Sequence, residues 1–170
     1  MQALEAILSR RSIRKFSSEP VDEGTIEEIL KAAMSAPSAG NQQPWHFVVI
    51  RDRALLDRVP QIHPHSLMIR EVPVAILVCA DPTLETHKGY WVQDCAAATE
   101  NILIAVQSLG LGAVWLGVFP REERVTGLRD LLGIPPHVIP FSLVPIGHPA
   151  EQKPPSQRFT REKIHLNGWI

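Results

Sequence analysis

Apolar residues recur at helical spacing in three stretches of the N-terminal part of the chain. Residues 1–9 and 21–34 carry apolar side chains at intervals of three and four, which predicts two amphipathic helices. Pro37 closes the second helix, because a proline inside a helix removes a hydrogen bond and clashes with the preceding turn. A third, short helix is predicted over residues 52–59.

Continuous short apolar runs predict four buried strands, since a strand covered on both faces carries apolar side chains at every position. These runs are residues 46–50, 74–80, 112–119 and 138–147. The first run is rich in β-branched residues and the last ends at a glycine, as is typical of strands.

Two more helices are predicted in the second half of the chain. The longer helix runs from about residue 88 to residue 109, where repeated alanines allow close packing and Gly110 can cap the end. The other spans residues 122–133 and ends at a glycine. Residues 60–73 receive no assignment, because flanking and internal prolines interrupt any regular period.

Strands and helices interleave throughout, so the fold class is α/β or α+β, within a single domain over residues 1–170. A parallel, doubly wound sheet is one option, and the irregular spacing of the strands leaves it open. From Pro149 onward the chain is polar and proline-rich, which predicts an extended arm over residues 149–170.

The composition is that of a folded globular protein, with 45% hydrophobic and 21% charged residues. A formal net charge of -1 gives no general attraction to nucleic acid or to an anionic membrane, so neither is an expected partner. The most apolar long stretch, residues 90–111, is interrupted by charged and amide side chains that a membrane span would not carry.

Cys79 and Cys95 lie far apart in apolar surroundings without a metal-ligand spacing, so both are expected to be buried free thiols. Free thiols suit a reducing cytoplasm. The N-terminal sequence also carries its basic residues after the apolar stretch, which is the reverse of a signal peptide. We therefore expect a cytoplasmic protein.

A short basic segment follows the first predicted helix and contains Arg10, Arg11, Ser12, Arg14 and Lys15. Guanidinium groups pair with phosphate oxygens and a hydroxyl adds a hydrogen bond, so this segment could hold one phosphomonoester. Charge alone favours a solvated basic turn instead. A nucleic-acid site would need a wider basic face, for which a nearly neutral chain gives little support.

The segment PSAGNQQPW, residues 37–45, places prolines, a glycine and three side-chain amides between a helix and a strand. Amides donate and accept hydrogen bonds at once, which suits the polar edge of a heterocycle such as a flavin. The alternative is a rigid connector whose amides satisfy the loop backbone, and chemistry alone favours it.

Three other sequence features give less support for a functional site. His63 and His65 lack a third metal ligand, so an exposed loop is expected there. The glycines at 110, 112 and 117 follow a helix and enter a strand, which is the reverse of a dinucleotide-binding fingerprint. No G-x-S-x-G elbow occurs, and no catalytic acid or base is predicted.

Taken in order, the segments RRSIR, PSAGNQQPW, a long central helix, WLG, IGHP and a tail with Arg158 resemble the nitroreductase family over nearly the whole chain. The resemblance implies a three-layer α+β fold with a central mixed, mainly antiparallel sheet flanked by helices. It also implies a C-terminal arm that extends onto a partner subunit in a homodimer.

The resemblance further implies FMN as cofactor, bound at the subunit interface. The positions matching the family's FMN contacts are Arg10, Arg11, Ser12, Arg14, Pro37, Ser38, Ala39, Asn41, Trp115, Leu116, Gly117 and Arg158. The first four and Arg158 match the grip on the phosphate and ribityl chain. Residues 37–41 match a loop brought by the partner, and residues 115–117 match the strand end at the reactive edge of the ring.

The implied activity is ping-pong hydride transfer from NADH or NADPH through FMN to a small organic acceptor such as a nitroaromatic or a quinone. A flavin-binding or flavin-handling protein without nicotinamide turnover is the alternative. The acceptor and the preferred nicotinamide stay open. The chain lacks an obvious insertion that larger members use as a lid, and the role of residues 61–72 in the pocket is also open.

Overall fold

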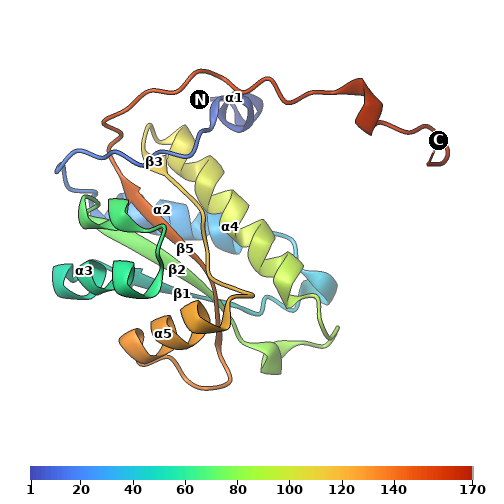
Figure 1. Cartoon of the computed structure of the whole chain (residues 1–170). Coiled ribbons are helices and arrows are strands. Elements are labelled where there is room, and N and C mark those ends of the chain that lie inside the picture. Colours follow the sequence, from blue (N-terminus) through green and yellow to red (C-terminus); the bar gives the residue numbers. More distant parts are fainter. Residues whose placement is uncertain (170) are drawn as a thin grey trace.

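The computed structural model describes residues 1–169, in which one β-sheet lies between helices (Figure 1). The α-helices are α1 Ala3–Ser9, α2 Glu23–Met34, α3 Arg53–Ile62, α4 Trp91–Ser108 and α5 Glu122–Leu132. The strands are β1 Trp45–Ile50, β2 Val74–Ala80, β3 Gly112–Ala113, β4 Leu116–Gly117 and β5 Ile139–Gly147. Short 3-10 turns are η1 Ala39–Asn41, η2 Leu67–Arg70, η3 Pro82–Leu84 and η4 Arg161–Lys163.

The sheet has the order β1-β2-β5-β3, and β4 also pairs with β5. Every ladder between these strands is antiparallel. A single parallel bridge joins Ser12 to Ala113. The mixed, mainly antiparallel sheet is therefore confirmed, and the parallel, doubly wound option is wrong.

Two apolar cores fill the space on either side of the sheet, with α2 and α4 on one face and α3 and α5 on the other (Figure 1). Strand β2 shows why its sequence is continuously apolar. Ile76 and Val78 belong to the core under α2 and α4, whereas Leu77 and Cys79 belong to the core under α3 and α5. A strand covered on both faces has no position for a polar side chain.

The predicted strand over residues 112–119 is wrong in its extent, because the structure splits it into β3 and β4. Gly112 and Ala113 pair with Gly147 and Ile146, and continuing that register brings Val114 opposite Pro145. Proline has no N–H to donate, so the ladder stops there. It resumes where Leu116 pairs with Leu143.

The helix boundaries also differ by a few residues from the sequence pattern. Helix α3 continues through Pro60 to Ile62, beyond the predicted end at residue 59. Helix α4 begins at Trp91, three residues later than predicted. Gly110 follows α4 with a left-handed φ of 76°, which agrees with its predicted role at the helix end. Within residues 1–169 no helix is long and apolar enough to cross a membrane.

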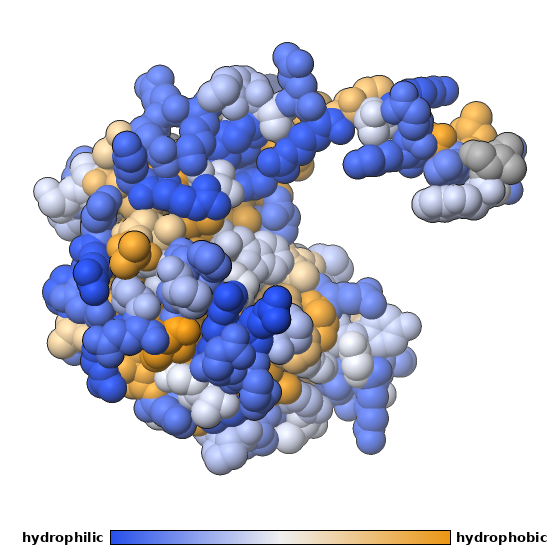
Figure 2. Space-filling view, in the orientation of Figure 1, coloured by the Kyte–Doolittle hydropathy of each residue, from blue (hydrophilic) through white to orange (hydrophobic). Residues whose placement is uncertain are grey.

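The C-terminal segment has little regular structure, and its first part lies along residues 11–17. Ser17 N donates to His148 O (2.9 Å) and Ala150 N donates to Lys15 O (2.9 Å). Residues 156–159 pass beside α1 and α4, where they line a cavity, and the chain then leaves the body of the molecule (Figures 1 and 2). Up to residue 169, η4 is the regular structure of this part. Phe159 and Trp169 on this arm are 81% and 90% exposed.

Candidate functional site

The basic segment begins where α1 ends, at Arg10. The guanidinium Nε of Arg10 lies 3.6 Å from a carboxylate oxygen of Glu100 on α4. Arg10 and Arg158 line the same cavity of about 520 Å³, together with Glu100 and Phe159. The structure thus brings together two cationic residues that are 148 positions apart in the sequence.

Arg11 points into a different cavity, so the basic segment is divided. Its Nε donates to Pro154 O (2.7 Å), and its Nη1 contacts the carbonyls of Leu8 and Arg10. Its Nη2 is buried and has no hydrogen-bond partner within residues 1–169. This guanidinium ties α1 to the base of the arm and keeps one unused donor.

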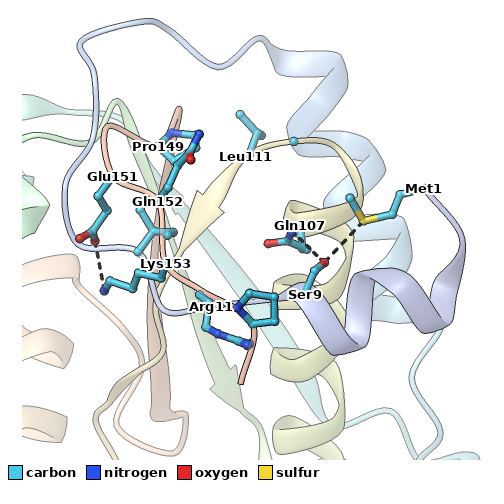
Figure 3. A pocket seen from close by; sticks show the side chains of 12 residues that line it. Met1, Ser9, Arg11, Gln107, Leu111, Pro149, Glu151, Gln152 and Lys153 are labelled. Atoms are coloured by element: carbon cyan, nitrogen blue, oxygen red, sulfur yellow. Dashed lines mark hydrogen bonds and ion pairs between the residues drawn. The ribbon is translucent and has the colours of Figure 1, made fainter. Parts of the chain in front are cut away.

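The cavity beside Arg11 has a volume of about 320 Å³, and an ion pair lies at its edge (Figure 3). Lys153 Nζ lies 3.2 Å from Glu151 and donates to Ser12 O (2.6 Å). Glu151 also accepts from Arg14 N (2.6 Å), and this hydrogen bond lowers the pKa of its carboxyl. Sequence reasoning missed Glu151 and Lys153, because only folding brings residues 151–153 beside residues 12–14.

Arg14 and Ser12 contact the rest of the chain through their backbones. The Arg14 side chain is exposed, and its backbone N–H makes the contact with Glu151. Ser12 is half-buried, and its backbone bridges to Ala113. Both residues therefore hold the backbone of the basic segment against the sheet and the arm.

The segment of residues 37–45 is held on the first turns of α4. Ala39 N and Gln42 Nε2 donate to the two oxygens of the buried Asp94 side chain, at 3.0 and 2.7 Å. Gln42 Oε1 accepts from the backbone N–H groups of Thr86 and His87, at 3.1 and 3.0 Å. For Gln42, the alternative of a rigid connector whose amide satisfies the backbone is confirmed.

The rest of this loop presents its outer side to solvent. Pro37, Gly40 and Asn41 are exposed, and Ser38 Oγ accepts from Gln43 N (3.1 Å). Gly40 has a left-handed φ of 55°, and an added Cβ would lie 2.5 Å from the ring of His87. Only glycine fits this position. The loop is therefore held in one conformation by its own hydrogen bonds and exposes its outer side to solvent.

The strand end at residues 115–117 combines a buried aliphatic side chain, a half-buried indole and a bare backbone. Leu116 is buried, and the Trp115 ring lies 6.0 Å from that of Phe141. Gly117 is exposed, and a Cβ built there would meet no atom within 4 Å. Its φ is outside the left-handed region, so nothing inside the chain requires a glycine there. A glycine in open space suits the close approach of another molecule to the backbone.

Behind this glycine lies a residue that the sequence analysis placed wrongly. The predicted exposed loop at His63 is wrong, because His63 is 2% exposed and its Nε2 lies 3.0 Å from Gly117 O. Arg124 Nη1 donates to the same carbonyl at 2.7 Å. Burial lowers the pKa of the His63 imidazole. Within residues 1–169 no three His, Cys, Asp or Glu side chains gather as a metal site.

Two distances show how far the basic segment lies from Gly117 and from the amide loop. From the Ser12–Ala113 bridge to Gly117 the chain runs four residues in extended form, about 13 Å. Along α4, the loop is held at Asp94, whereas Ser9 is held at Gln107, 13 residues away and therefore about 20 Å. The basic segment and the amide loop thus lie towards opposite ends of α4.

The two cysteines take no part in these sites. Cys79 and Cys95 are free and buried, as predicted. Burial raises the pKa of the Cys79 thiol to about 12 and raises that of Cys95 as well. Both thiols are therefore protonated at neutral pH and behave as apolar core groups.

A three-layer α+β fold with a cationic cavity, an amide loop and an open strand-end glycine defines the class of protein. The family model described as the Nitroreductase family matches residues 7–83 and 63–148 of this chain. A protein of Methanothermobacter thermautotrophicus, named NADH dehydrogenase/NAD(P)H nitroreductase, is 53% identical over 169 residues, covering 99% of this chain and 88% of that protein. The chain belongs to the nitroreductase family.

Solved structures agree. The crystal structure of a protein of Parabacteroides distasonis, named NADH dehydrogenase/NAD(P)H nitroreductase, is similar with a TM-score of 0.95 at 38% identity, covering 99% of each chain. The crystal structure of a nitroreductase from Desulfovibrio desulfuricans in complex with FMN is similar with a TM-score of 0.86 at 32% identity, covering 100% of this chain and 99% of that one.

Proposed function

We propose that this chain is an FMN-dependent oxidoreductase that uses NADH or NADPH and reduces a small organic acceptor, such as a nitroaromatic or a quinone. The observation that carries the proposal is the open backbone of Gly117, about 13 Å along the chain from the basic segment. Relatives named NAD(P)H nitroreductase and a similar structure that contains FMN support it.

The residues present fit the phosphate end of FMN. Arg10 and Arg158 face one cavity, and guanidinium groups bind a phosphate through paired hydrogen bonds. Glu100 holds Arg10 in the absence of an anion, so phosphate binding exchanges one anionic partner for another. Arg11 lines the neighbouring cavity, where its guanidinium donates to Pro154 O and holds the base of the arm beside the basic segment.

The ring end fits as well. Gly117 lets a flat molecule approach the backbone, while Trp115 and Leu116 supply an apolar flank. FMN, when bound, supplies the hydride-accepting and electron-releasing chemistry, so the protein needs no catalytic acid or base. The role of this chain's residues is to bind the cofactor, orient it and provide positive charge close to it.

A homodimer completes the site in this proposal. The loop of residues 37–41 presents exposed backbone and the Asn41 amide, towards the end of α4 away from the basic segment. The second copy supplies its own loop to the flavin. The exposed aromatic side chains of the arm, Phe159 and Trp169, are buried on the partner, because an isolated chain leaves them in water.

The proposal is tested on the protein purified as full chain without added flavin. An absorbance spectrum measures bound FMN, and anaerobic mixing with NADH or NADPH in a stopped-flow instrument follows loss of the oxidised-flavin absorbance. We expect about one FMN per chain and rapid bleaching, followed by reoxidation with nitroaromatics or quinones. A yellow protein that neither nicotinamide bleaches is a flavin-binding or flavin-handling protein instead.

The phosphate assignment has its own test. Replacing Arg10 and Arg158 by Ala removes both cationic groups of the cavity, and FMN retention is expected to fall severely. Arg70, an exposed arginine at the end of η2, gives a matched control as Arg70→Ala. A double-alanine protein that keeps the wild-type FMN content contradicts the assignment.

A further inference from the structure

The carbonyl oxygen of Gly117 has two donors that come from different helices. His63 follows the last residue of α3, and its Nε2 lies 3.0 Å from this oxygen. Arg124 lies near the start of α5, and its Nη1 lies 2.7 Å from the same oxygen. Helices α3 and α5, which position these two residues, cover the same face of the sheet (Figure 1).

The hydrogen bonds of His63 determine which ring nitrogen carries the proton. His65 N donates to His63 Nδ1 (3.3 Å), so Nδ1 is the nitrogen with the free lone pair. The proton of the neutral ring is then on Nε2, which donates to Gly117 O (3.0 Å). Arg124 Nη1 lies 3.3 Å from Nε2 and donates to the same carbonyl oxygen. Burial and the nearby Arg124 charge lower the pKa of His63, so the ring is neutral at neutral pH.

We propose that His63 and Arg124 are positioning residues that lock the Gly117 peptide and hold a positive charge behind the flavin edge, which favours the anionic reduced cofactor. The inference rests on the proposed function, because it assumes that FMN lies against Gly117.

The backbone of Gly117 needs to be held in place because the residue is a glycine. Glycine has more backbone freedom than any other residue, and β4 is only two residues long. Two donors from different helices contact the Gly117 carbonyl oxygen, which restrains the peptide that follows it. The open face of Gly117 is thereby kept in one orientation for the ring.

The positive charge of Arg124 is not neutralised by a neighbouring side chain in the described part of the chain. Within residues 1–169 its guanidinium has no carboxylate partner, and its Nε is buried without a hydrogen bond. A cation that is partly removed from water and not neutralised acts strongly on charge that develops nearby. A reduced flavin with a negative ring is such a charge.

The experiment compares the midpoint potential of bound FMN in wild type, Arg124→Gln, His63→Leu and His63→Gln, by anaerobic chemical titration with a reference dye. Arg121→Gln is the matched control, because it removes one positive charge from an exposed side chain at the same helix start. FMN content and the melting temperature are measured in parallel, so that a loss of cofactor or fold is recognised.

We expect Arg124→Gln and His63→Leu to keep FMN but to shift its potential to more negative values. The preference for reduced over oxidised FMN should fall about ten-fold, within the usual range of coupling between two sites. His63→Gln keeps an N–H donor and should recover much of the wild-type value, and Arg121→Gln should match wild type. If Arg124→Gln fails to fold, Arg124→Met, which also removes the charge but keeps a long side chain, takes its place with the same expected shift.

Unchanged potentials in folded, FMN-containing Arg124→Gln and His63→Leu overturn the inference. A wild-type protein that binds FMN but is not reduced by NADH or NADPH overturns the proposed reaction alone, because chemical titration still measures the potentials. A wild-type protein that binds no FMN overturns both.

Discussion

At the scale of single residues, Asp94 holds the amide loop in place. Its side chain is buried at the start of α4 and accepts from Ala39 N and Gln42 Nε2. Gln42 in turn receives two backbone N–H groups, from Thr86 and His87. Each side-chain oxygen of Asp94 and Gln42 therefore accepts a hydrogen bond from an N–H group. Replacing any of these oxygens by an NH2 group would bring two donors together.

Asp94→Asn should destabilise the protein for that reason. The new NH2 group faces either Ala39 N–H or Gln42 Nε2, and turning the Gln42 amide only moves the clash to Thr86 and His87. A buried donor left without an acceptor costs roughly 1–3 kcal/mol. Thermal unfolding followed by circular dichroism should show a melting temperature lower by several degrees.

The control for this change is Asp130→Asn, the same replacement at an exposed position of α5. It should leave the melting temperature nearly unchanged. If the two variants melt together, the Asp94 network contributes little to stability and the loop is held by other contacts.

His63 gives the protein a predictable response to acid. Its pKa in the folded state is lowered by burial from the model-compound value of 6.5, so the unfolded chain binds the proton more tightly. Stability is therefore full above about pH 6.5 and is lost progressively as the pH falls towards the folded-state pKa. Urea unfolding from about pH 7.5 to about pH 5.5, at fixed protein concentration, measures this loss.

His63→Gln supplies the comparison, because glutamine does not titrate. The stability advantage of wild type over this variant should shrink as the pH falls. Parallel stability curves for the two proteins would show that His63 takes up its proton as easily in the folded state as in the unfolded state.

The sequence suggested candidate site residues where a residue type carries its own chemistry. Arg10 and Arg158 were recognisable as cations for a phosphate, and the structure brings them to one cavity. The hydrogen bonds of His63 and Arg124 to the Gly117 carbonyl could not be predicted from the sequence. His63 and Arg124 are 54 and 7 residues from it and contact a backbone carbonyl, which leaves no pairing signal in the side chains.

At the scale of elements, strands covered on both faces were the easiest to predict. β2 is buried at every position, so its seven-residue apolar run defines it completely. The break between β3 and β4 depends instead on Pro145 of another strand, opposite Val114 in the continued register. A sequence pattern read within one segment does not report such a partner. The same limit hid the pairing of the arm's base with residues 11–17.

At the scale of the whole molecule, the arm separates into two parts with different roles. Residues 148–154 are hydrogen-bonded to the basic segment and belong to the body of the subunit. Residues 156–159 line a cavity with Arg10 and Glu100, and the arm projects from the body beyond them (Figure 2). Phe159, Leu166 and Trp169 are mostly exposed. Burying a large apolar side chain contributes roughly 1.5–3 kcal/mol, so these side chains can supply a substantial part of the association energy of a dimer.

A chain that ends at Pro155 should therefore fold but fail to dimerise. The hydrogen bonds at the base of the arm stay intact, so the far-ultraviolet circular dichroism of the body should be preserved. Light scattering after size exclusion should give the monomer mass, and FMN should be lost, because the proposed site includes the partner's loop and Arg158 is removed. The full-length double variant Phe159→Ser with Trp169→Ser keeps Arg158 and tests the apolar contacts alone. Dimerisation of this variant at wild-type concentration would show that the arm does not hold the subunits together, and a monomer that binds FMN normally would show that one chain suffices for the site.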